Sequence, residues 1–359
     1  MLKRIAMLTV VAGVFVLAVM AAEDKPAPEA AAKVKIPDMK FDDVTEIAPG
    51  VFFRYSSISA TDPKVPFGGS NNIWIVFKDY VVVVDANFPK EAGDVIAAIK
   101  KTTDKPIKYV LDTHHHGDHA YGNCIWAKEG AKIVAHTNAA RLLETAGPKS
   151  WADAAKDRKD IRDNELKKAD ISFDDKYVLD DGTQRVEFRY FGHSHTRGDA
   201  VAYLPKQKIL CTGDACVNGA FNFMGHANSA TWVTCLEGMQ KLDVDLICPG
   251  HGKVGGKDVL AKQKRYFVDM RAEIKKGMDA KKPLDEITDS LDMAWYKEWT
   301  GKAAKDIKEN VKHVYNEYQG KIDHNTLGAR PAPLDYFQRE PATAHAAAVP
   351  ALLRGPGAE

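Results

Sequence analysis

The chain carries the segment Thr113-His114-His115-His116-Gly117-Asp118-His119. Within it, His114, His116, Asp118 and His119 are candidate metal ligands, packed into a stretch too short to be more than a loop or the end of an element. Imidazole nitrogens and carboxylate oxygens together suit zinc and related first-row metals. A site of this kind that also holds water turns that water into a nucleophile near neutral pH. The segment therefore predicts a metalloprotein with hydrolytic chemistry.

Three further candidate ligands lie downstream, and each follows a strand-like apolar run. They are His195, Asp214 and His251, which follow the runs Val186 to Phe191, Lys208 to Cys211, and Leu246 to Cys248. Side chains at the ends of separate strands can converge on one edge of a sheet, where short loops hold them rigidly. The total of seven ligands is too many for one tetrahedral ion, and it fits two ions that share a bridging carboxylate.

The order of these motifs resembles the metallo-β-lactamase superfamily. His-x-His-x-Asp-His is followed by a lone His, then Gly-Asp, then Gly-His-Gly, and the resemblance covers roughly residues 45 to 255. It implies an α/β fold, a four-layer αβ/βα sandwich with the metals at one edge of its sheets. The resemblance also implies two metal-binding groups. The first metal would be held by His114, His116 and His195, and the second by Asp118, His119 and His251. Asp214 would bridge the two metals, and Asp85 would lie behind the ligands and orient them.

The resemblance also guides the expected reaction. True zinc β-lactamases carry Cys or Ser where this chain has Asp214, so the likeness is closer to thioester, lactone and phosphodiester hydrolases of the glyoxalase II kind, and to exported members found beside quinoprotein dehydrogenases. We expect two zinc ions, although the same ligands accept iron or manganese. The expected nucleophile is a hydroxide between the ions, its pKa lowered to about 7, which attacks an acyl carbon or a phosphorus. Asp118 is the predicted catalytic residue, because it would both ligate a metal and orient this hydroxide.

Two alternatives stay open at this point. One is sulfur oxidation with a single iron, as in the persulfide dioxygenase branch that the chain also resembles. The other is a periplasmic protein of the same fold that binds metal or ligand without catalysis. The presence of His251 and of the full second group of ligands favours the dinuclear hydrolase, because a site with one iron does not require them.

Other histidines near the motifs have separate interpretations. His115 lies between two ligands on an extended segment, so its side chain points the other way, behind the site or toward the substrate. His193 and His226 are candidate substrate contacts, since His193 lies two residues before His195 and His226 follows the Gly-Asp turn at Asp214. His136 follows a short strand and is interpreted as structural. Cys216 is not assigned as a ligand, because Asp214 already occupies the matching position.

The N-terminus indicates export. Two basic residues precede an apolar stretch over residues 5–19 that ends in small residues, which is the order of a secretory signal, so residues 1–22 are the predicted signal peptide. An uncleaved anchor is the alternative, but the stretch is shorter than the ~20 residues that span a bilayer comfortably. We therefore expect a periplasmic or secreted protein with no stable membrane insertion after cleavage. Five cysteines are an odd number for an oxidising compartment, so at least one thiol stays free or pairs between chains.

Composition excludes one large class of partner. The formal net charge is +1, without a block of like charge, so nothing indicates nucleic-acid binding. The expected partner is a small-molecule substrate.

The pattern along the chain predicts the domain organisation. Strand-like runs alternate with helical ones, such as 91–100 and 120–128, which implies sheets covered by helices. The expected parts are a flexible leader at 23–44, the metal-binding domain at 45–255 with an exposed, charged helical insertion at about 149–176, a helical extension at 256–326, and a loose tail at 327–359. The insertion is interpreted as a solvated face that could act as a lid. The extension would pack on the sandwich or on the second subunit of a homodimer.

Overall fold

The structure is a computed structural model that describes residues 36–56, 69–219, 223–291 and 293–324. The predicted signal peptide and the predicted loose tail lie outside these ranges. Within them, no helix has both the length and the apolar character needed to cross a bilayer.

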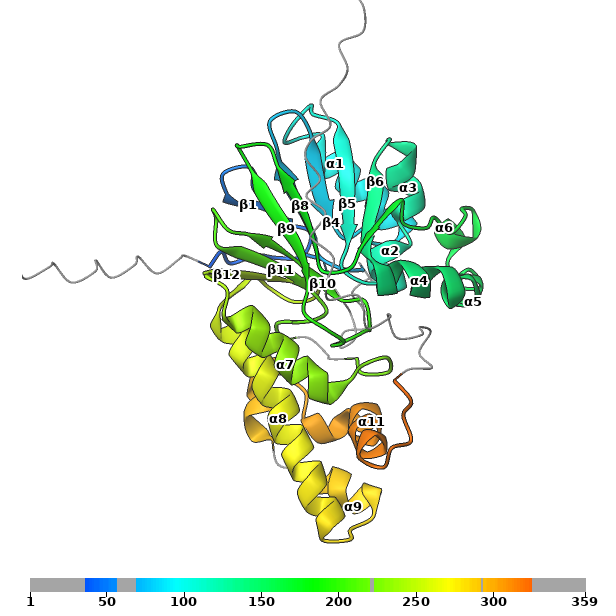
Figure 1. Cartoon of the computed structure of the whole chain (residues 1–359), viewed down its shortest axis with the longest axis vertical. Coiled ribbons are helices and arrows are strands. Elements are labelled where there is room, and N and C mark those ends of the chain that lie inside the picture. Colours follow the sequence, from blue (N-terminus) through cyan, green and yellow to red (C-terminus); the bar gives the residue numbers. More distant parts are fainter. Residues whose placement is uncertain (1–35, 57–68, 220–222, 292, 325–359) are drawn as a thin grey trace, which may run out of the picture. The chain divides into compact units, whose positions relative to one another are not determined.

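Two sheets form the framework of the domain (Figure 1). The first has seven strands in the order β1-β2-β3-β4-β5-β6-β7, in which neighbours pair antiparallel up to β4 and parallel from β4 onward. Its strands are β1 (Val44–Ala48), β2 (Val51–Arg54), β3 (Asn72–Val76), β4 (Val81–Val84), β5 (Ile107–Asp112), β6 (Lys132–His136) and β7 (Ile171–Phe173).

The second sheet has six strands in the order β13-β12-β11-β10-β9-β8, and its pairs are antiparallel except for β11 with β12. Its strands are β8 (Lys176–Asp180), β9 (Arg185–Tyr190), β10 (Ala200–Leu204), β11 (Ile209–Gly213), β12 (Leu246–Pro249) and β13 (Gly255–Gly256).

Helices follow the strands and continue beyond the sheets. The helices are α1 (Pro89–Ile99), α2 (Gly117–Ala120), α3 (Asn123–Lys128), α4 (Thr137–Thr145), α5 (Gly147–Ala154), α6 (Lys159–Arg162), α7 (Ser229–Gln240), α8 (Asp258–Asp279), α9 (Leu284–Asp289), α10 (Ala294–Thr300), the 3-10 helix η1 (Ala304–Asp306) and α11 (Lys308–Tyr318). The helices expected over 91–100 and 120–128 correspond to α1 and α3.

Strand β4 shows why the layers form. All four of its valines are buried, and alternate ones face opposite sides of the sheet. Val82 and Val84 pack between the two sheets with residues such as Phe188 of β9, whereas Val81 and Val83 pack against helices α1 and α3. A strand buried on both faces has no polar alternation, which explains its continuous apolar run.

The second sheet is covered in the same way. Its outer face contributes Val201 and Leu210 to a cluster with Trp232 of α7 and Phe267 of α8. The order is therefore helices, sheet, sheet, helices, and the predicted αβ/βα sandwich with additional C-terminal helices is confirmed.

The C-terminal helices belong to this outer layer. Residues of α10 and α11, among them Tyr296, Val311 and Val314, are buried in the same cluster as α7 and α8. Helix α8 alone buries Val259, Leu260, Phe267 and Met270 along one face. The extension therefore packs on the sandwich, which was one of the two placements expected for it.

Two predicted boundaries are wrong. The segment at 149–176 is helical only as far as Arg162: after the short helices α5 and α6 it forms β7, which pairs with β6 and completes the first sheet. Its charges hid the alternation of Ile171 and Phe173, which supply the packing. The predicted leader at 23–44 also extends too far, since Met39 is 1% exposed and packs between the sheets.

The cysteines are buried in the body of the domain. All five fall within the described ranges, and none forms a disulfide. Cys211 and Cys248 lie opposite each other on β11 and β12 and contribute to the core between the sheets. They therefore act as small apolar residues.

His136 links the end of β6 to the start of α4. Its Nδ1 accepts a hydrogen bond from the backbone N–H of Asn138 at 3.2 Å, and its Nε2 donates to the carbonyl of Asp174 at 2.9 Å. The ring stacks on Tyr190 with the centroids 3.8 Å apart. Burial lowers the pKa of His136 to about 4. The imidazole is therefore neutral and structural.

We predict that His136 makes the fold sensitive to acid. The unfolded chain binds a proton at this residue with its ordinary pKa of 6.5, but the folded chain binds it only near 4, so stability is lost as pH falls from 6.5 toward 4. Relative to a His136→Asn variant, which keeps a capping oxygen without this titration, the wild type should lose roughly 2 kcal/mol by pH 5. Urea unfolding of both proteins at pH 7.5 and pH 5 checks this, and equal losses in the two proteins would contradict it.

Candidate metal centre

The seven predicted ligands gather at one edge of the two sheets. His114 and His116 lie in the loop after β5, with His116 at the N-cap of α2, and Asp118 and His119 lie within α2. The other three come from the second sheet: His195 from the connection between β9 and β10, and Asp214 and His251 from the segments that follow β11 and β12. Strand ends from both sheets therefore deliver side chains to a common point, as the motif spacing predicted.

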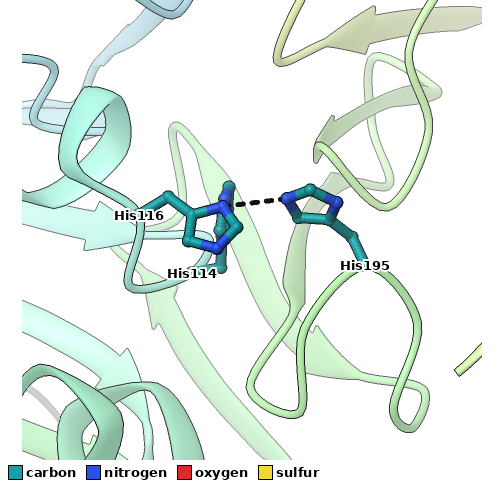
Figure 2. A group of neighbouring side chains, drawn as sticks. All are labelled: His114, His116 and His195. Atoms are coloured by element: carbon teal, nitrogen blue, oxygen red, sulfur yellow. Dashed lines mark hydrogen bonds between the residues drawn. The ribbon is translucent and has the colours of Figure 1, made fainter. Parts of the chain in front are cut away.

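The first group consists of His114, His116 and His195. One ring nitrogen of each lies within 4.8 Å of those of the other two. The rings point toward one another from the two sides of the site, and His195 Nε2 lies 3.0 Å from His116 Nδ1 (Figure 2). Burial, together with neighbouring histidines, lowers the pKa of His114 and His116 well below the ordinary value. These imidazoles are therefore neutral, which is the form that binds metals.

The second group consists of Asp118, His119 and His251, whose ligand atoms also lie within 4.8 Å of one another. Asp118 Oδ2 lies 3.2 Å from His251 Nε2 and 3.5 Å from His119 Nε2. This group has a carboxylate, unlike the first.

Asp214 lies between the two groups. Its Oδ2 is 3.6 Å from His195 Nε2 of the first group and 3.3 Å from His251 Nε2 of the second, and its Oδ1 is 3.4 Å from His119 Nε2. This approach depends on glycine, because a Cβ on Gly250 would lie 2.3 Å from Asp214 Oδ1. One carboxylate therefore faces histidines from both groups, which is the position that a bridging ligand requires.

In the second group, protonated histidines offset the negative charge of the carboxylates. Burial opposes protonation of His251, but the nearby Asp214 and Asp118 raise its pKa to about 9. Burial also opposes protonation of His119, but the carboxylates of Asp118, Asp85 and Asp214 raise its pKa well above the ordinary value. Burial alone would raise the pKa of Asp214, but His251 and His119 lower it to about 2. The site thus stabilises positive charge among carboxylates, and a divalent cation would supply that charge directly.

A buried atom without a partner indicates that the residues fit a metal. His114 Nε2 is inaccessible to solvent and has no hydrogen-bond partner among the described residues, although its ring faces the first group. Leaving such an atom unsatisfied is costly unless it binds something. Histidine and carboxylate donors of this kind suit zinc, iron or manganese.

Asp85 supports the second group from behind. It is buried with a positive φ of 66°, and it accepts hydrogen bonds from Thr113 N at 2.8 Å and Thr113 Oγ at 3.1 Å. Its Oδ2 also accepts from His119 Nδ1 at 2.8 Å, which turns His119 Nε2 toward the ligands. This is the orienting position expected for Asp85.

The remaining histidines separate into two kinds. His226 Nδ1 lies 2.8 Å from His116 Nε2, on the side of that ring away from His195, and His115 lies close to both. Burial lowers the pKa of His115 to about 3. His193 instead donates from Nε2 to the His226 carbonyl at 2.8 Å and faces His324. His193 therefore holds the backbone of the His226 loop, and it is not among the described residues that line the adjoining cavity.

A cavity of about 400 Å³ opens beside the ligands. Its walls include His115, His116 and His226 from the site, Leu142 and Ser150 from α4 and α5, and Arg197. Sequence analysis missed α4 as a wall and missed Arg197. The position of Arg197, two residues after His195, was the available signal.

Comparisons with known proteins agree with this geometry. Residues 65–251 match the family described as the metallo-beta-lactamase superfamily. A metallo-beta-lactamase type 2 from Bacillus sp. (strain 170) is 27% identical over 197 residues, covering 53% of this chain and 70% of that protein. The 2,4-dinitroanisole O-demethylase subunit alpha of Nocardioides sp. (strain JS1661) is 24% identical over 148 residues, 41% of each chain.

A solved structure shares the fold. The metallo-beta-lactamase from Pontibacter korlensis superposes with a TM-score of 0.51 at 21% identity, and the match covers 63% of this chain and 98% of that one. At this identity the likeness concerns the fold alone.

We predict that metal binding at this centre releases protons. His251 and His119 bind metal only when neutral, yet their raised pKa values keep them protonated at pH 7. Apparent zinc affinity should therefore rise with pH until about 9 and fall in acid, with about one to two protons released per chain at pH 7. Calorimetric titration in buffers of different ionisation enthalpy measures this, and an affinity independent of pH between 6 and 9 would contradict it.

We predict that Asp85→Asn weakens zinc binding about 10- to 100-fold, because His119 loses its negatively charged acceptor. Asparagine tolerates the positive φ at this position, so the backbone should persist. Competition with a chromophoric chelator measures the affinity. Asp94→Ala, an exposed carboxylate on the nearby α1, is the control and should bind zinc normally. Unchanged affinity in Asp85→Asn would remove the proposed role.

Proposed function

The chain is a hydrolase of the metallo-β-lactamase superfamily, and we propose that its candidate metal-binding clusters hold two zinc ions. His114, His116 and His195 would hold one ion, Asp118, His119 and His251 the other, with Asp214 shared. The observation that carries this proposal is the position of Asp214, whose carboxylate contacts histidines of both groups. Bound zinc supplies a nucleophile by lowering the pKa of water toward about 7, and it polarises the oxygen of the group under attack.

Asp118 has the properties of the residue that orients the nucleophile. Its side chain is 17% exposed, whereas that of the supporting carboxylate Asp85 is 2% exposed. Burial opposes its ionisation, but His119 and His251 hold the pKa of Asp118 well below the ordinary value. The group is therefore an ionised carboxylate within reach of solvent, able to accept a hydrogen bond from water and to direct its lone pair.

The proposed substrates are small molecules with an acyl or phosphoester bond. Relatives named as β-lactamases are only 24–27% identical, which is too distant to transfer their substrate. The aspartate at 214, where the resemblance places Cys or Ser in true zinc β-lactamases, favours thioesters and lactones. A cavity of about 400 Å³ lies toward the small end of ligand pockets, which agrees with a small substrate.

The alternatives make different demands on the same residues. A single-iron dioxygenase does not need the second group, yet Asp118, His119 and His251 are assembled within ligand distance. A protein that only binds ligands does not need an ionised carboxylate open to solvent beside the histidines. Both observations support the hydrolase.

We further propose that the mature protein works in the periplasm or outside the cell. The support is the order of basic, apolar and small residues over 1–22.

The test joins metal analysis to a substrate panel. We expect about two zinc ions per purified chain and hydrolysis of at least one class among thioesters, lactones, phosphodiesters and β-lactams, with activity lost on chelation and restored by zinc. Asp118→Ala should lower kcat by about 100-fold or more, while the melting temperature of the metal-free protein stays unchanged. Asp289→Ala, an exposed carboxylate on α9, is the matched control. Full activity of Asp118→Ala after metal removal, or one iron with oxygen consumption, would refute the proposal.

A further inference from the structure

One charged side chain distinguishes the lining of the cavity beside the metal centre. Among the described residues that line it, Arg197 is the one permanent cation, and none is Asp or Glu. We propose that the substrate carries a carboxylate and that Arg197 binds it. This inference rests on the proposed hydrolase function and adds the charge class of the substrate.

The backbone of Arg197 is held rigidly. Its carbonyl accepts hydrogen bonds from Asn138 Nδ2 at 3.1 Å and from the Tyr190 hydroxyl at 2.9 Å. The next residue, Gly198, packs so tightly on α4 that a Cβ would lie 2.3 Å from Ala139 N. The guanidinium therefore extends from a fixed base, which reduces the entropy lost when it binds a ligand.

The side chain of Arg197 lacks a counter-ion. Its Nη1 donates to the carbonyl of His324 at 2.5 Å, and no carboxylate in the described ranges forms an ion pair with it. Other partly buried arginines differ, since Arg158, Arg189 and Arg271 each pair with a carboxylate. A half-buried guanidinium is costly to desolvate without an anion, and its planar fork matches a carboxylate. The missing partner is what a ligand would supply.

The rest of the cavity suits an apolar body. Leu142 and Ala146 contribute apolar surface, and Tyr121 adds an aromatic ring. Because His115 and His116 line the same cavity as Arg197, one molecule can contact Arg197 while its scissile group meets the metal centre. The structure thus favours short acyl compounds with a second, anionic end.

The first experiment compares two esters of equal chain length and leaving group. Mono-4-nitrophenyl glutarate has a terminal carboxylate, and 4-nitrophenyl pentanoate has a methyl group in its place. For the wild type, we expect kcat/KM to favour the anionic ester by about 10- to 100-fold, mainly through KM. Arg197→Met and Arg197→Gln should remove this preference for the anionic ester, and Arg197→Lys should retain part of it.

Arg141→Met is the matched control, because Arg141 is an exposed arginine on α4 and does not line the cavity. It should keep the wild-type ratio. Arg197→Gln retains a donor for the His324 carbonyl, so it tests the charge even if Arg197→Met fails to fold. A ratio that is unchanged in Arg197→Gln would overturn the proposal.

A second measurement separates this proposal from the proposed function. Phenylacetate and its neutral amide are titrated into the protein as purified, with wild type and Arg197→Gln compared, so that any binding of carboxylate to metal is common to both proteins. We expect Arg197→Gln to lose at least about 10-fold in affinity for phenylacetate only. Equal affinities would overturn the carboxylate site even if esters are hydrolysed. Binding that depends on Arg197 without hydrolysis of any ester would leave the site intact and refute the hydrolase.

Discussion

The carboxylate of Asp214 contacts three histidines at 3.3 to 3.6 Å, and the rest of the site depends on this arrangement. A buried carboxylate is costly unless positive charge surrounds it. That charge must come from protons on His119 and His251 or from cations in the same place. Because His195 and His251 come from the second sheet and His119 from the first, all three contacts of Asp214 form together only when the two sheets pack face to face with their ends aligned. The fold and the metal centre are therefore consequences of the same packing.

The C-terminal helices take part in the site. Glu317 of α11 accepts from Ser229 N at 2.9 Å, and His313 Nε2 donates to the Ala227 carbonyl at 3.1 Å. These contacts hold the segment that follows His226, whose Nδ1 lies 2.8 Å from Nε2 of the candidate ligand His116. Helix α11 is thus connected to a candidate metal ligand through the backbone of Ala227 and His226 and the contact of His226 with His116. The extension stabilises the position of the ligands as well as covering the second sheet.

The cavity and the metal centre differ in whether their charged side chains have partners. At the centre, Asp118 and Asp214 have histidines around them, and Asp85 has three donors. In the cavity, Arg197 contacts a carbonyl and, within the part of the chain that the structure describes, no carboxylate. The first arrangement is complete apart from the cations that the ligands imply, whereas the second lacks an anion.

Much of the fold and the ligand set could be predicted from the sequence, because the ligands are local motifs placed where apolar runs end. The apolar runs Lys208 to Cys211 and Leu246 to Cys248 indicated strands, and both coincide largely with strands in the structure. Prediction failed at Ile171–Phe173, where abundant charge concealed the strand β7, and at Met39, which lies in the segment expected to be a flexible leader. The sequence by itself determined which residues can bind metal and which segments must be buried. Only the tertiary structure decided that Arg197 has no counter-ion among the described residues, that α4 lines the cavity and that α11 contacts the segment after His226, because these relations join residues distant in the chain and depend on packing.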